Sequence, residues 1–88
     1  MKTKKEFTLH QIGDEHIIMP GGTGNVDFSR IISLNPTAAR LWESVEGKEF
    51  DAETLTAYLT EHYEVETATA SRDALRLIED WQKAGIIE

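Results

Sequence analysis

The spacing of hydrophobic residues along the chain changes once, near Asn35. Before this residue, apolar and polar side chains alternate with a period close to two, as is typical of strands. The segments with this pattern are residues 7–12, 16–20 and 28–34. Gly13 and Asp14 predict a tight turn after the first segment, and the glycine-rich residues 20–27 predict a longer loop after the second. We therefore expect three strands.

After Asn35 the apolar residues recur every three or four positions, which predicts helices. Asn35 suits an N-cap, and Pro36 suits the first helical position, where a backbone N–H would have no partner. Asp51 is the predicted N-cap of a second helix. A third helix is predicted over residues 68–84, followed by Gly85, which tolerates the left-handed conformation common at helix ends. The predicted core face of this helix is Ala70, Ala74, Leu77, Ile78, Trp81 and Ala84.

These elements predict one α+β domain over residues 1–88, a three-stranded antiparallel sheet followed by three helices, with residues 1–6 flexible. The longest apolar run is three residues, too short to span a membrane. The basic start of the chain has no apolar segment behind it and is not a signal peptide. We expect a cytoplasmic protein with no membrane partner.

The acidic charge of the chain is concentrated in its second half. Residues 1–34 contain four basic and four acidic side chains, whereas residues 35–88 contain five basic and twelve acidic ones, which gives the net charge of −7. Because such a surface repels phosphate backbones, we do not expect a nucleic-acid partner.

Catalytic and ligand-binding patterns are not found in the sequence. There is no cysteine, and none of the three histidines has a second ligand at metal spacing on its own element. The GGTG segment at residues 21–24 is not followed by the Lys-Ser/Thr pair of a phosphate-binding loop. We therefore expect no metal, no cofactor and no enzymatic activity.

The edge of the predicted sheet is a candidate binding surface. If the third strand lies at the edge beside the third helix, a groove forms in which an extended peptide can add as a fourth strand. Leu75 falls outside the core face of the helix, so it lines this groove, covers the second helix or is simply an exposed leucine. The same edge could pair two copies of the chain in a homodimer.

Several residues follow one another in an order typical of one protein family. They are LN-x-TAA-x-x-W at residues 34–42, Gly47, the sequence Tyr63-Glu64-Val65, Asp73, and KAGII at residues 83–87. This order resembles the coenzyme PQQ synthesis protein D family, the stand-alone recognition element for RiPPs, which are ribosomally made and modified peptides. The resemblance covers residues 28–88, and residues 7–19 by pattern only.

The resemblance implies a winged-helix-like, non-catalytic adaptor, or peptide chaperone. It would bind the leader segment of a precursor peptide as a strand added to its third strand. It would then present the precursor to a modifying enzyme, often a radical S-adenosylmethionine (SAM) enzyme; PQQ biosynthesis itself does not follow. The peptide-binding candidates carried over by position are Phe28, Ser29, Arg30, Ile31, Ile32, Ser33, Ser71, Leu75, Ile78 and Gln82. A narrower interpretation assigns Phe28, Ile32 and Ile78 to the core.

Two other functions stay open. Winged helices commonly read DNA, but the predicted third helix has three basic and three acidic residues and so lacks the positive charge that DNA binding requires. A structural subunit of an enzyme complex would use the same strand edge for docking.

Overall fold

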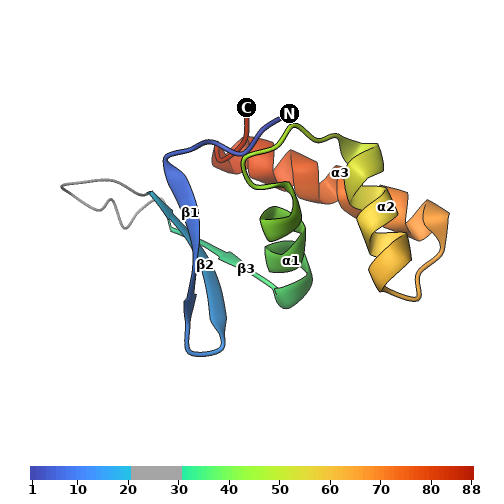
Figure 1. The fold of residues 1–88 in the computed structure, drawn as a ribbon, viewed down its shortest axis with the longest axis horizontal. Helices are drawn as coiled ribbons and strands as arrows, with labels where there is room; N and C mark the ends of the chain where they lie inside the picture. Colours follow the sequence, from blue (N-terminus) through green and yellow to red (C-terminus); the bar gives the residue numbers. More distant parts are fainter. Residues whose placement is uncertain (21–30) are drawn as a thin grey trace.

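The computed structural model describes residues 1–20 and 31–88, which form three strands and three helices (Figure 1). The strands are β1 (Phe7–Ile12), β2 (Glu15–Pro20) and β3 (Ile32–Leu34), and the helices are α1 (Pro36–Val45), α2 (Ala52–His62) and α3 (Thr67–Ala84). The α+β class and the order of elements confirm the prediction. The third strand was predicted to start at Phe28, but in the structure β3 starts at Ile32, and residues 21–30 lie outside the described part of the chain.

The strands form one antiparallel sheet in the order β1-β2-β3. Gly13, with φ of 62°, permits the tight turn between β1 and β2. Ile18 in the central strand lies opposite Leu9 of β1 and Ile32 of β3, and it is fully buried. This row therefore faces the core, and β1 and β3 are the two edges of the sheet.

The helix ends carry the capping interactions that the sequence predicts. The Asn35 side-chain oxygen accepts a hydrogen bond of 2.7 Å from the Ala38 amide at the start of α1. The Asp51 carboxylate accepts one of 2.9 Å from the Thr54 amide at the start of α2, and the Thr54 hydroxyl accepts one from the Asp51 amide. Gly85, with φ of 75°, ends α3 in the left-handed conformation. These bonds satisfy amides that a helix terminus otherwise leaves without partners.

All three helices and the sheet share one hydrophobic core. Helix α1 contacts β1 and β3, and α2 packs along α3 (Figure 1). At the centre, the rings of Trp42 and Trp81 meet edge to face with centroids 5.3 Å apart. The other buried apolar residues are Phe7, Ile18, Leu34, Ala38, Ala39, Leu41, Val45, Phe50, Leu55, Leu59, Ala70, Ala74, Ile78, Ile86 and Ile87. Among the described residues, no helix has the length and apolarity needed to cross a membrane.

The first residues of the chain, which we expected to be flexible, are hydrogen-bonded to its last residues. Lys2 and Glu88 exchange two backbone hydrogen bonds of 2.8 Å, and the Lys4 amide donates to the Ile86 carbonyl at 3.0 Å. Thr3 is buried, and its hydroxyl accepts a hydrogen bond from the Gly47 amide. The two ends lie side by side (Figure 1). Flexibility of residues 1–6 stays a prediction, which amide exchange at these hydrogen bonds would test.

Candidate functional site

Strand β3 offers a free backbone edge. It pairs with β2 on one side, with Ile32 opposite Ile18 and Ser33 opposite Ile17, and has no strand partner on its other side in residues 1–20 and 31–88. Because side chains alternate along a strand, Ile32 is directed toward the core while Ser33 is exposed on the opposite face. The unpaired N–H and C=O groups of such an edge can bond to another extended chain.

A hollow of about 200 Å³ lies against this strand. Its β3 side runs from Ile32 to Leu34, and α3 supplies the opposite wall. The lining residues are Ile32, Ser33, Leu34, Asn35, Ala38, Leu77, Asp80, Trp81 and Ala84. A groove between the third strand and the third helix, which the sequence analysis inferred, is therefore present in the structure.

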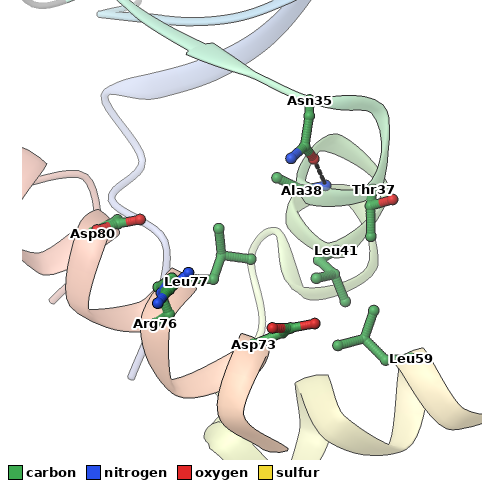
Figure 2. Close-up of a pocket in the computed structure, with 9 residues that line it drawn as sticks. All are labelled: Asn35, Thr37, Ala38, Leu41, Leu59, Asp73, Arg76, Leu77 and Asp80. Carbon is green, nitrogen blue, oxygen red and sulfur yellow. Dashed lines mark hydrogen bonds between the residues drawn. The ribbon is translucent and has the colours of Figure 1, made fainter. Parts of the chain in front are cut away.

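A second hollow of about 400 Å³ lies beyond the end of β3, between α1, α2 and α3 (Figure 2). Asp73 and Leu77 extend from α3 toward Leu41 of α1 (Figure 2). The lining residues are Asn35, Thr37, Ala38, Leu41, Leu59, Asp73, Arg76, Leu77 and Asp80. The two hollows share Asn35, Ala38, Leu77 and Asp80, so they adjoin. We call them together the β3–α3 groove.

The β3–α3 groove combines an apolar floor with a charged border. Ala38, Leu41 and Leu59 are buried residues whose side chains form the floor of the larger hollow, while Asp73 and Asp80 are exposed. An apolar surface with a few polar groups around it is the usual composition of a ligand-binding cleft. Among the described residues no group of three or more His, Cys, Asp or Glu side chains could hold a metal ion. The arrangement is thus suited to binding a chain segment.

The sequence profile of the family described as coenzyme PQQ synthesis protein D (PqqD) matches residues 15–87. The chain belongs to the PqqD family. This finding confirms the resemblance seen in the sequence, and it extends over β2, β3 and all three helices. A comparison of this sequence with curated proteins found no match.

Two solved structures have the same fold as this PqqD family member. One is TbiB1 in complex with the TbiA(beta) leader peptide, which is 22% identical, with a TM-score of 0.74, and covers 100% of this chain and 95% of that one. The other is lasso peptide synthetase B1 complexed with the leader peptide, which is 24% identical, with a TM-score of 0.72, and covers 99% of this chain and 95% of that one. At this identity, the likeness establishes the fold.

Only some of the six predicted site residues from the third strand lie at the β3–α3 groove. Ile32 and Ser33 line the smaller hollow. Ile31 is half-buried and directly precedes β3. Phe28, Ser29 and Arg30 fall outside the described residues. Peptide binding by these six residues stays a prediction.

The helix half of the predicted site differs from the face that α3 turns toward β3. None of Ser71, Leu75, Ile78 and Gln82 lines either hollow. Leu75 is 57% exposed and Ile78 is 6% exposed, so the first is at the surface and the second is in the core, as the narrower interpretation had it. The α3 residues that do line the groove are Asp73, Arg76, Leu77, Asp80, Trp81 and Ala84.

The apolar stripe predicted for the core of α3 also contains the sequence signal for this face. Leu77 and Ala84 belong to the predicted apolar stripe, yet Leu77 is only half-buried and Ala84 is exposed. Both lie at the border of the stripe, next to Asp73 and Asp80 at helical spacing. An apolar stripe that is wider than the core it covers, and that is bordered by charges, indicates a surface for a second chain.

Proposed function

We propose that this PqqD family protein is a peptide-binding adaptor that captures the leader segment of a ribosomally made precursor peptide. The leader adds as a fourth strand to the free edge of β3, and its alternate side chains enter the β3–α3 groove. The observation that carries this proposal is the outer edge of β3, which has no strand partner within residues 1–20 and 31–88 and lies directly beside the smaller hollow. The family and the two leader-peptide complexes with the same fold support it.

The choice of β3 over β1 rests on what lies beside each edge. Both strands are edges of the sheet, but both hollows of the β3–α3 groove include residues from the β3–α1 junction and none from β1. An added strand gains backbone hydrogen bonds at either edge. Only at β3 do these hollows also receive its side chains, which is where sequence specificity arises in strand addition.

In this proposal the protein only binds and presents the precursor peptide, and a separate enzyme modifies it. We propose that it hands the bound precursor to a modifying enzyme, such as a radical SAM enzyme, while the leader stays on β3. The bound leader would occupy β3, so enzyme docking would use another surface of the domain. A homodimer through the β3 edge would compete with the leader for the same backbone groups.

The proposal is tested by selecting peptides of about 15 random residues on the purified protein by mRNA display, then measuring backbone amide exchange with the enriched peptides bound. Amides of β3 that point away from β2 should exchange more slowly with peptide bound, and amide NMR shifts should follow the groove-lining residues of α3. Binding that protects the β1 edge instead, or a failure to enrich any peptide, would refute the proposal. Duplex DNA serves as the control ligand, and we expect no salt-dependent binding to it.

A further inference from the structure

The larger hollow of the β3–α3 groove extends past the end of the strand that a peptide would pair with. Strand β3 ends at Leu34, and Asn35 already caps α1. The hollow of about 400 Å³ begins at Asn35 and reaches Leu59 and Asp73. A peptide that leaves β3 at this end would therefore lie over a second, larger cavity where side chains alone can make the contacts.

Two carboxylates that line this cavity, those of Asp73 and Asp80, form no ion pair within residues 1–20 and 31–88. In this part of the chain the ion pair on α3 is between Lys83 and Glu79 at 3.1 Å. Arg76 lies between the two aspartates in sequence and also lines the cavity, so its charge offsets one of them. One negative charge remains.

The start of α1, the other charged feature of the cavity, has few free donors for an anion. A helix N-terminus attracts anions through its unpaired amides. Here Pro36 has no N–H, the Ala38 amide donates to the Asn35 side chain, and the Ala39 amide donates to the Asn35 carbonyl. Of the amides of residues 37–39, that of Thr37 donates neither to the side chain nor to the carbonyl of Asn35. The cavity therefore favours a cation.

We propose that the larger hollow selects a leader peptide with a lysine or arginine just beyond the segment paired with β3. The methylene stem lies on Leu41, Leu59 and Leu77, and the charged end pairs with the Asp73 carboxylate, which projects toward this floor (Figure 2). Asp80 adds to the negative potential at the junction of the two hollows. This inference rests on the proposed function, because it specifies the chemistry of the peptide that the groove binds.

The test compares mRNA-display selections on three proteins: the unchanged chain, Asp73→Lys and Glu79→Lys. Glu79 is the matched control, since it is an exposed acid on the same helix that lines neither hollow. We expect peptides from the unchanged chain to share an alternating apolar pattern with a Lys or Arg at a fixed distance from it. Peptides selected on Asp73→Lys should have an acidic or neutral residue at that position. Peptides selected on Glu79→Lys should keep the basic residue there.

A quantitative arm uses one enriched peptide and its variant in which norleucine, a neutral residue with a similar stem, replaces the basic residue. The replacement should weaken binding to the unchanged chain about threefold to fivefold, as for a solvent-accessible ion pair. It should have no effect on binding to Asp73→Asn, a conservative variant that keeps the side-chain shape. Equal weakening in both proteins would overturn the pairing with Asp73.

The outcomes separate this inference from the function on which it rests. Two results would overturn the inference and leave the adaptor function intact. The enriched peptides could slow amide exchange at β3 without any preference for a basic residue, or the preference for a basic residue could persist in peptides selected on Asp73→Lys. If no peptide is enriched, or none affects β3, the adaptor function fails and the inference fails with it.

Discussion

Leu77 and Leu75 lie two residues apart on α3 and provide a matched test of which helix face binds the peptide. Leu77 is half-buried and lines both hollows of the β3–α3 groove, whereas Leu75 is 57% exposed and lines neither. The two substitutions Leu77→Ala and Leu75→Ala remove the same atoms from the same helix. They differ in whether those atoms face the groove.

The expected magnitudes follow from burial. Leu77→Ala removes part of the apolar floor that a bound peptide would cover, and we expect a loss of about 1 kcal/mol in binding, or about fivefold in Kd. Its cost to folding should also be about 1 kcal/mol, below the 2–5 kcal/mol typical of fully buried leucines. For a domain of this size that lowers Tm by roughly 5 °C. Leu75→Ala should change both quantities by less than about 0.5 kcal/mol.

Isothermal titration calorimetry with one enriched peptide measures Kd, and circular dichroism during heating measures Tm. Because the stability loss of Leu77→Ala is moderate, the variant stays folded at 25 °C and its affinity is measurable. If Leu75→Ala weakened binding as much as Leu77→Ala or more, the assignment of the groove to the Asp73, Leu77 and Asp80 face would be wrong. The face first suggested by the sequence, with Leu75 at its centre, would then be the binding surface.

Three further outcomes are expected. Asn35→Ala should lower the free energy of unfolding by about 1 kcal/mol in urea titrations, while Asn35→Asp, which keeps the acceptor for the α1 amide, should not. Hydrogen bonds from the backbone and side chain of Thr54 hold the pKa of Asp51 below its ordinary value of 3.8. The stability that Asp51→Ala removes should therefore be constant at neutral pH and shrink as the pH falls below that value, and a difference in Tm that persists unchanged in strong acid would contradict this. In amide exchange experiments, Lys2 and Lys4 should exchange more slowly than in an unstructured peptide, since both amides donate to backbone carbonyls; unstructured rates would mean that the start of the chain is flexible after all.

Local signals made much of the fold predictable. Asn35 and Pro36 determine where α1 starts through interactions within four residues, and Gly85 ends α3 through its own backbone conformation. Helix ends such as these depend on residues that are close together in the sequence, so the sequence pattern alone can predict them. The sequence left open which strands form the two edges of the sheet, and the strand order β1-β2-β3 places β3 at one of them.

The face that α3 presents to β3 was not predictable in the same way. Helical spacing places Leu77 and Ile78 in one stripe, but in the structure Ile78 enters the core and Leu77 lines the groove. This difference depends on how α3 packs against the rest of the shared core, which the spacing within one helix does not determine. The bonds between Lys2 and Glu88 likewise join positions at opposite ends of the sequence, where no periodicity indicates a contact.

The edge-to-face pair of Trp42 and Trp81 gives the protein an intrinsic fluorescence signal close to the proposed binding site. Both indole Nε1–H groups are buried and have no hydrogen-bond partner among the described residues, so both rings should emit at short wavelength in the free protein. Only Trp81 also lines the smaller hollow, 5.3 Å from Trp42 by ring centroids. A segment that fills the smaller hollow should change the surroundings of Trp81 and therefore its emission, and Trp81→Phe should remove that response. We therefore expect tryptophan fluorescence to report when a chain segment occupies the β3 edge, without any added label.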